Sequence, residues 1–309
     1  MKSTSFFLLA TLLILLVLLL YDLNGVSPLV FNYRLNRILS ALFTGAIIAL
    51  AGVLLQSSLR NPLVDHYLLG VGSGALTATY LSVIAFNGYF LGVQVFSMMG
   101  GLAALALTIL LAEKLAGTSS SYILAGIGVN SLLSGASVLL SYIAVRVYPY
   151  AQLLLVGSFI TSTPEKLQVL AGTLVFSTVL FTLIAKPLNT LSVSDEFAVT
   201  AGFNPRITRL TSIIVAGLSS SIVTSMYGLI GFIGLASPHM ARYITGRSDN
   251  RVVGPVAILL SSTLLYLTDF TSRRVFTAVW GEVPAGAVAS LIGAPYFIYL
   301  LVFKRGALR

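Results

Sequence analysis

Long uncharged stretches limit most strongly what this chain can fold into. Residues Ile38–Leu55 and Tyr67–Ala112 contain no Asp, Glu, Lys or Arg. A membrane-spanning helix needs about 20 apolar residues, and a span in lipid must be a helix or part of a closed barrel, because its backbone groups find no water there. These runs lack the alternation of a barrel strand. The sequence therefore predicts an all-α polytopic membrane protein, in keeping with a mean hydropathy of +0.98.

About ten apolar segments are long enough, or nearly long enough, to cross a bilayer. The predicted spans are 6–22, 36–57, 67–86, 91–112, 121–145, 167–185, 207–227, 231–245, 252–272 and 284–303. The first is interpreted as a retained helix and not a cleaved signal peptide, because Tyr21-Asp22 stands where a small-x-small cleavage pattern would follow. The shorter apolar stretch Tyr148–Ile160 is interpreted as a surface or re-entrant helix.

The distribution of basic residues predicts that both termini are cytoplasmic, since cytoplasmic loops of membrane proteins are enriched in Lys and Arg. With the N-terminus inside, the inner side holds Lys2, Arg60, Lys114, Lys186, Arg206, Arg209, Arg242, Arg247, Arg251, Lys304, Arg305 and Arg309. The outer side holds Arg34, Arg37, Arg146, Lys166, Arg273 and Arg274. Because these charges are scattered along the chain, the net charge of +9 does not indicate nucleic-acid binding.

A polar hinge, Gln56–Gly74, separates the two uncharged runs. Asn61-Pro62 breaks a helix, because proline lacks a backbone donor and disfavours a helical residue before it. Glycines at every second position, Gly70, Gly72 and Gly74, permit close backbone approach or local unwinding. We expect such a hinge at the mouth of a membrane pathway.

Several chemistries are excluded or disfavoured. The chain has no cysteine, so it forms no disulfide or thiolate metal site. It has no Gly-Lys-Ser/Thr and thus no phosphate-binding loop of that kind. The predicted span centres lack carboxylates and lysines, which proton- or sodium-coupled carriers usually keep at depth. His239 follows Pro238 and is interpreted as a packed histidine, not as a metal ligand. No metal or cofactor is expected on this chain, and a pump of this kind would take its energy from a partner.

Two shorter patterns concern the polar segments. Residues 192–202 predict a short helix with Ser192 or Ser194 as its cap, acids in its first turn and Gly202 at its end. Such a helix could dock in a partner's groove or lie solvated in a loop.

A repeated pattern of arginines is the second feature. Arg34-Leu-Asn-Arg37 opens the second span and Arg206-Ile-Thr-Arg209 opens the seventh. Five spans apart, the two copies face opposite ways, which suggests an inverted repeat.

Five motifs together resemble the FecCD-type permeases, the membrane subunits of ABC importers for iron–siderophores, haem and cobalamin. The motifs are Arg34-Leu-Asn-Arg37, Leu59-Arg-Asn-Pro-Leu63, Leu68-Leu-Gly-Val-Gly-Ser-Gly74, Gly231-Phe-Ile-Gly-Leu-Ala-Ser-Pro-His239-Met-Ala-Arg242, and Glu282-Val-Pro-Ala-Gly286 with Leu291-Ile-Gly-Ala-Pro-Tyr-Phe297. The resemblance runs from about Arg34 to Lys304. It implies one permease domain over 1–309, with the type II ABC importer fold and an inverted repeat.

The resemblance also implies partners in a cell membrane. These are a second copy of the chain with the pathway at the interface, two ATPase subunits inside that carry ATP and Mg²⁺, an extracytoplasmic solute-binding protein, and surrounding lipid. The chain itself would catalyse no reaction. The expected cargo is an iron–siderophore; cobalamin, haem, and molybdate or tungstate stay open. An autonomous channel or secondary carrier is the alternative from another class, and an intramembrane protease is disfavoured because Gly-x-Ser-x-Gly is absent.

Three groups of residues match family positions with known roles. Arg34, Arg37 and Arg273 resemble the arginines that dock the binding protein, although lipid headgroups could also anchor them. Within 190–206, the residues that resemble the cytoplasmic coupling helix are Asp195, Glu196, Phe197, Ala198, Ala201 and Gly202. Asn61, Leu63, Ser119 and Ser120 resemble the cytoplasmic gate, where a helix cap at Ser119 or Ser120 is a compatible interpretation. Thr118–Ser121 lacks the basic residue that some members have before Tyr122.

Overall fold

The computed structural model describes residues 2–25, 27–86, 92–149, 151, 156–277 and 281–303. This part of the chain is helical, and it contains one isolated bridge, between Val156 and Leu229, but no strand. The helices are α1 Lys2–Leu23, α2 Pro28–Ser58, η1 His66–Leu69, α3 Val71–Ala85, α4 Val93–Lys114, α5 Ser119–Val147, α6 Pro164–Leu191, α7 Asp195–Thr200, α8 Pro205–Tyr227, α9 Ile233–Thr245, α10 Asn250–Thr271, the π-helical turn η3 Ser272–Phe276, and α12 Ala285–Phe303.

The predicted span at 67–86 covers both η1 and α3, which meet at Gly70, and each of the other nine predicted spans coincides largely with one helix. Among the described residues, six helices are long and apolar enough to cross a membrane: α2, α4, α5, α6, α8, and α10 with its π-helical extension. Three shorter apolar helices coincide with further predicted spans, at Phe7–Leu23, Val71–Ala85 and Ala285–Pro295. The predicted span at 231–245 forms the short helix α9, which has Pro238 in its interior. The predicted all-α membrane fold is confirmed.

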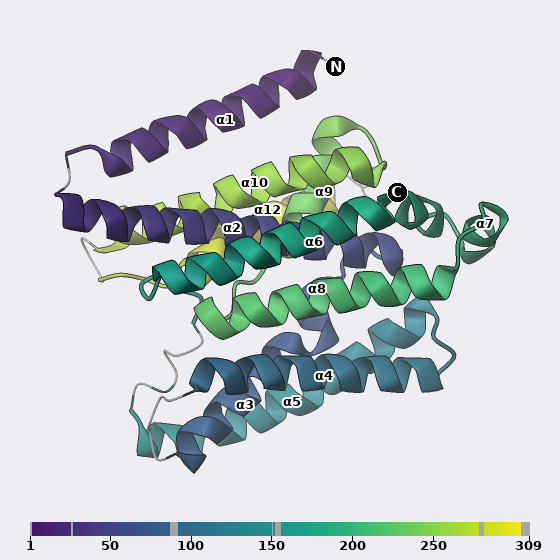
Figure 1. Cartoon of the computed structure of the whole chain (residues 1–309), viewed down its shortest axis with the longest axis horizontal. Coiled ribbons are helices and arrows are strands. Elements are labelled where there is room, and N and C mark those ends of the chain that lie inside the picture. Colours follow the sequence, from purple (N-terminus) through teal and green to yellow (C-terminus); the bar gives the residue numbers. More distant parts are fainter. Residues whose placement is uncertain are drawn as a thin grey trace.

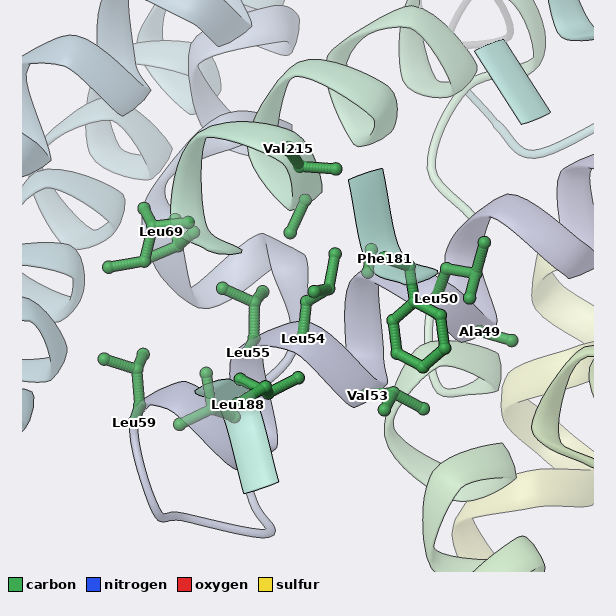
Figure 2. Close-up of a cluster of buried hydrophobic side chains, with 14 of the residues drawn as sticks. Ala49, Leu50, Val53, Leu54, Leu55, Leu59, Leu69, Phe181, Leu188 and Val215 are labelled. Carbon is green, nitrogen blue, oxygen red and sulfur yellow. The ribbon is translucent and has the colours of Figure 1, made fainter. Parts of the chain in front are cut away.

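Helix α2 is the centre of the bundle. It packs against α6, α8, α9 and α10, and most of its apolar length is buried inside the protein. Figure 2 shows Leu50, Leu54 and Leu55 of α2 facing Phe181 of α6 and Val215 of α8. In a bilayer the lipid is as apolar as these side chains, so close packing is the main favourable term for this contact. A glycine on α2 permits the closest crossing: a Cβ on Gly52 would lie 2.0 Å from the carbonyl oxygen of Gly234 in α9.

Helices α3, α4 and α5 pack together as a second group, and α8 connects this group to α2 (Figure 1). The figure also shows that α2 and α8 run in opposite directions, since α2 leads toward α7 while α8 leads away from it. The two helices that begin with the repeated Arg-x-x-Arg pattern are therefore antiparallel within one molecule, as the pattern predicts.

The prediction of a helix over Tyr148–Ile160 is wrong for its described second half; residues 152–155 lie outside the described part. Val156 bridges to Leu229, the backbone N–H of Ser158 donates to the carbonyl of Tyr227 at 2.9 Å, and Gly286 donates to Gly157 at 2.9 Å. This extended segment fills the break between α8 and α9. It replaces a helix because its backbone groups bind those that the break leaves unpaired.

Candidate functional site

The predicted functional residues gather at two opposite ends of the bundle, and α2 reaches both. At the end where α2 begins lies a group that we call the Asp22 cluster: Asp22, Arg34, Arg37, Asp269, Arg273, Arg274 and Glu282. At the end where α7 lies is the Asp195 cluster: Arg60, Glu113, Asp195, Arg206 and Arg209. Both are networks of ion pairs, and Figure 1 shows that the start of α2 and the helix α7 lie at opposite ends of the bundle.

Arg37 is the most enclosed cation of the Asp22 cluster. Its side chain is 3% exposed, and its Nε and Nη2 atoms donate to both carboxylate oxygens of Asp269 at 2.7–3.1 Å. Nη2 also contacts Glu282, and Nη1 donates to the hydroxyl of Tyr33 at 3.4 Å. All three nitrogens of this guanidinium are thus bound within the chain, so a partner carboxylate would have to compete with an existing bidentate pair.

Asp22, at the end of α1, is fully buried and joins three arginines. Arg273 holds its carboxylate at 2.7 and 3.2 Å and reaches Asp269 at 2.9 Å. Arg34 donates to the carbonyl of Asp22 at 2.7 Å, and Arg274 lies 3.5 Å from the carboxylate. Among the three predicted docking residues, Arg34 keeps the most exposed side chain, and Arg274, which the sequence did not single out, is 39% exposed.

The predicted short helix is confirmed as α7, and its caps follow from its sequence. The hydroxyl of Ser194 accepts from the N–H of Phe197 at 3.0 Å, which settles the choice between the two serines. Gly202 has a φ of +83°, and the N–H of Phe203 closes the helix onto the carbonyl of Ala198 at 2.9 Å. This is the usual glycine-terminated end of a helix.

The two acids of α7 lie in different environments. Asp195 binds Arg209 through both carboxylate oxygens at 2.7 and 2.9 Å and Arg60 at 3.1 Å. Glu196 is exposed, and its own backbone N–H together with the Ser194 hydroxyl lowers the pKa of its carboxyl below the ordinary value. Exposed beside it are Phe197 at 49% and Val199 at 60%. Ala198 is buried, whereas Ala201 and Gly202 are exposed. The helix thus presents an acidic and apolar face outward.

The predicted gate residues come from two turns that meet. The carboxamide of Asn61 accepts from the N–H of Leu63 at 2.9 Å, which shapes the turn after α2. The hydroxyl of Ser119, at the start of α5, lies 3.5 Å from the carbonyl of Ser58 at the end of α2. Leu63 and Ser120 are exposed. The helix cap of α5 is Thr118, whose hydroxyl accepts from Ser121, and so the expectation of a cap at Ser119 or Ser120 is wrong by a residue.

An open groove of about 480 Å³ lies beside the Asp195 cluster. The side chain of Arg209 joins two of the residues that line this groove. It is 3% exposed, binds Asp195, and donates from Nη1 to the carbonyl of Gly117 at 3.2 Å. Arg206 binds Glu113 at 2.6 Å on the rim. The groove is lined by Glu113, Ala116, Gly117, Thr118, Asp195, Asn204, Pro205, Arg206 and Arg209.

The two histidines of the chain lie inside the bundle. His66 and His239 are both buried, and within the described ranges no three His, Asp or Glu side chains are grouped as a metal site requires. Close to His239, Arg242 donates to Gln56 at 2.6 Å and to Ser57 at 3.3 Å, which ties α9 to the end of α2. The sequence singled out Arg242 only as part of a motif.

Known proteins resemble this chain over nearly its whole length. The model of the FecCD transport family matches residues 4–303. The Fe(3+)-citrate import system permease protein YfmE of Bacillus subtilis is 32% identical over 278 residues, which is 88% of this chain and 81% of that protein. The "Probable heme-iron transport system permease protein IsdF" of Staphylococcus aureus is 31% identical over 279 residues, which is 90% of this chain and 83% of that one.

Two solved structures share the fold. One is titled "An inward-facing conformation of a putative metal-chelate type ABC transporter"; it is 30% identical, has a TM-score of 0.85 and covers 98% of this chain and 100% of its own. The other is PsaBC from Streptococcus pneumoniae in complex with Fab, 15% identical, with a TM-score of 0.61, covering 88% of this chain and 92% of its own. The second likeness concerns the fold alone.

Proposed function

The chain belongs to the FecCD transport family, and on that premise we propose that it imports a metal chelate, with an iron(III)–siderophore complex as the expected cargo. As a permease of this family it is a multi-pass membrane protein and a transport subunit, not an enzyme. The observation that carries the proposal is the similarity over 98% of the chain to a structure titled as a metal-chelate type transporter. Relatives named for iron citrate and for haem iron support the same cargo class.

The proposed assembly contains two copies of this chain, two ATPase subunits and a solute-binding protein. ATP and Mg²⁺ bind only to the ATPases. The exposed face of α7, with Glu196, Phe197 and Val199, is where we place the ATPase, because it combines apolar side chains with a charge at the surface. This puts the α7 end and both termini in the cytoplasm and the Asp22 cluster at the extracytoplasmic face.

The proposed mechanism is alternating access at the interface between the two copies. ATP brings the ATPases together and displaces both α7 helices. The turns that carry Asn61, Leu63, Ser119 and Ser120 then exchange between open and closed arrangements. The binding protein docks at the Asp22 cluster. Arg34, Arg37 and Arg273 were expected to contact it; the exposure of Arg34 favours direct contact there, while Arg37 and Arg273 would hold the surface in shape.

Purification from native membranes in mild detergent, followed by native mass spectrometry, tests the assembly. The expected particle has two copies of this chain and two ATPase chains. A particle of this chain alone, in several detergents, would favour an autonomous channel or secondary carrier instead.

Uptake into proteoliposomes that contain the assembly, with the binding protein outside and ATP inside, tests the cargo. The probes are ⁵⁵Fe-ferrichrome, ⁵⁵Fe-ferric citrate, haemin, ⁵⁷Co-cobalamin and ⁹⁹Mo-molybdate. We expect ATP-dependent uptake of an iron chelate. Uptake of molybdate alone would contradict the chelate proposal and favour an importer of the molybdate or tungstate type.

A further inference from the structure

The inference concerns Asp195, the first residue of α7. Its neighbour Glu196 is exposed and forms no ion pair among the described residues, whereas Asp195, with a side chain that is 37% exposed, is held by two arginines from different segments. One is Arg209 in α8, and the other is Arg60 in the turn after α2. Nη2 of Arg209 donates to both carboxylate oxygens of Asp195, and Arg60 binds one of them at 3.1 Å, so both oxygens already have partners within the chain.

The contacts of Asp195 reach both turns that carry the predicted gate residues. Arg60 directly precedes Asn61, so the pair at 3.1 Å ties α7 to the turn that leads to Leu63. Arg209 extends the connection, because it binds Asp195 at 2.7 Å and the carbonyl of Gly117 at 3.2 Å. Gly117 lies two residues before Ser119. The carboxylate of Asp195 thus connects α7 to the turn after α2, through Arg60, and to the turn before α5, through Arg209.

The backbone of Arg60 indicates that its side chain is needed at this point. Arg60 has a φ of +51°, and the N–H of Asn61 returns to the carbonyl of Gln56 at 3.1 Å. This hydrogen bond marks the helix end at which glycine normally takes the left-handed position. A residue with a side chain costs about 1 kcal/mol or more there. The ion pair with Asp195 gives a reason for an arginine at a position that glycine would fill without strain.

The groove beside Asp195 leaves room for relative movement. It separates the start of α8 from the turn between α4 and α5, and Asp195 is one of its lining residues. A displacement of α7 can therefore pull on Arg60 and Arg209 without first compressing close-packed side chains. A connection of this kind transmits movement through ion pairs and not through rigid packing.

We propose that Asp195 is a positioning residue that transmits the displacement of α7 to the turns at Arg60–Leu63 and Gly117–Ser120. The proposal rests on the proposed function, because it requires an ATPase that moves α7. It differs from the expectation that Asp195 contacts the ATPase: the outward face of α7 binds the ATPase, and Asp195 connects that event to the gate.

The test uses a reporter thiol at the gate, which the chain allows because it has no cysteine of its own. Leu63→Cys, at an exposed position, is the parent. The complex with its ATPase, in liposomes, is treated with a membrane-impermeant fluorescent maleimide, with and without ATP and vanadate. The labelling rate of this chain is read after gel separation, and ATP hydrolysis is measured on the same samples.

Two variants remove the connection, and one matched variant spares it. Asp195→Asn removes the carboxylate charge, and Arg60→Gly removes the other partner while relieving the left-handed strain. Glu113→Gln is the control, because it breaks an ion pair of 2.6 Å at the same groove that reaches neither α7 nor the turn after α2. Arg60→Gly also distinguishes a loss of coupling from a loss of stability. Because glycine adopts this backbone conformation without strain, the melting temperature of the variant should not fall.

In the parent and in Glu113→Gln, ATP with vanadate should change the labelling rate by about fivefold or more. Fivefold is about the smallest effect that one site of an allosteric protein usually has on another. Asp195→Asn and Arg60→Gly should hydrolyse ATP with little nucleotide effect on labelling. An unchanged nucleotide effect in Asp195→Asn, or a parent that hydrolyses ATP without any labelling response, overturns the inference and leaves the importer assignment intact. If no ATPase associates with the parent, the proposed function itself is wrong.

Discussion

Arg37 and Arg209 occupy matching positions in the repeated Arg-x-x-Arg pattern, and both side chains are enclosed, but the partner of Arg37 is fully buried whereas that of Arg209 is 37% exposed. Each is 3% exposed, and each binds both oxygens of one aspartate, Asp269 for Arg37 and Asp195 for Arg209. Removal of one member of a buried ion pair leaves the other as an uncompensated charge, which costs more than the intact pair contributes. Arg37, whose partner Asp269 is fully buried, should therefore differ sharply from the exposed arginines nearby.

Arg37→Ala tests this difference. We expect a loss of stability of about 3–5 kcal/mol, because Asp269 would stay buried without its main partner. Arg274→Ala is the matched control from the same cluster: its exposed side chain lies 3.5 Å from Asp22, which Arg273 still holds after the change, so the loss should be less than about 1 kcal/mol. Thermal unfolding of both variants in detergent provides the comparison. Equal melting temperatures would mean that Arg37 is not a structural residue.

Glu196→Arg tests the outward face of α7. The side chain is exposed, so folding should be unaffected, with a change in stability within about 0.5 kcal/mol. The charge reversal should uncouple ATP hydrolysis from transport, since the variant puts a cation in place of an acid on the face where we propose that the ATPase binds. The measurement is the number of cargo molecules taken up per ATP hydrolysed. The same ratio as in the unmodified protein would count against α7 as the coupling helix.

At the scale of the element, α2 and α9 cross closely because neither has a side chain at the point of contact. A Cβ on Gly52 would meet the carbonyl oxygen of Gly234, a Cβ on Gly234 would meet Ile48 of α2 at 2.9 Å, and α9 is the short helix interrupted by Pro238. The position of α9 thus depends on backbone contact with α2, and Arg242 adds hydrogen bonds to the same helix. Small residues at such crossings are typical of membrane helices.

Gly52→Ala should separate the two helices. The added Cβ would lie 2.0 Å from the carbonyl oxygen of Gly234, so the backbones must move apart, at a cost of about 1–3 kcal/mol for overpacking. Gly172→Ala in α6 is the control, because a Cβ at that position meets nothing within 4 Å. The readout is again thermal unfolding in detergent. A stable Gly52→Ala protein would show that α9 is free to shift.

At the scale of the whole molecule, an ion-pair network lies at each end of the bundle, and in each network an enclosed arginine of the repeated pattern binds an aspartate. In the Asp22 cluster Arg37 lies between two carboxylates, those of Asp269 and Glu282. In the Asp195 cluster one carboxylate lies between two arginines, Arg60 and Arg209. Because α2 and α8 are antiparallel, this pattern fits an inverted repeat whose halves place an ion-pair network at each face of the membrane (Figure 1).

Charge reversal at the Asp22 end should affect partner association more than stability. In Arg274→Glu we expect slower association of the binding protein and a weaker dependence of that rate on salt, because exposed charges at the rim of an interface mainly steer encounter. Stopped-flow or surface-based kinetics at two ionic strengths would measure both. Unchanged association at low salt would contradict docking at this end.

Local patterns were sufficient for the helices but not for the ion pairs. Ser194, the two acids and Gly202 predicted α7 correctly because a cap, a first turn and a helix end depend on neighbouring residues. Asp22 and Arg273 are 251 positions apart, and only the packing of α1 against α10 brings them together. The apolar residues 156–160 predicted a helix because a short apolar run does not distinguish a helix from an extended segment.

The burial of Asp22 has a consequence for biosynthesis. Helix α1 leaves the ribosome well before Arg273 and Arg274, which complete the neutralisation of Asp22 and lie 251 and 252 positions after it. Until then only Arg34 is available nearby in the sequence. The packing of α1 against the rest of the bundle should therefore be completed late in membrane insertion. In a chain truncated before residue 269, α1 should be loosely attached and accessible to proteolysis.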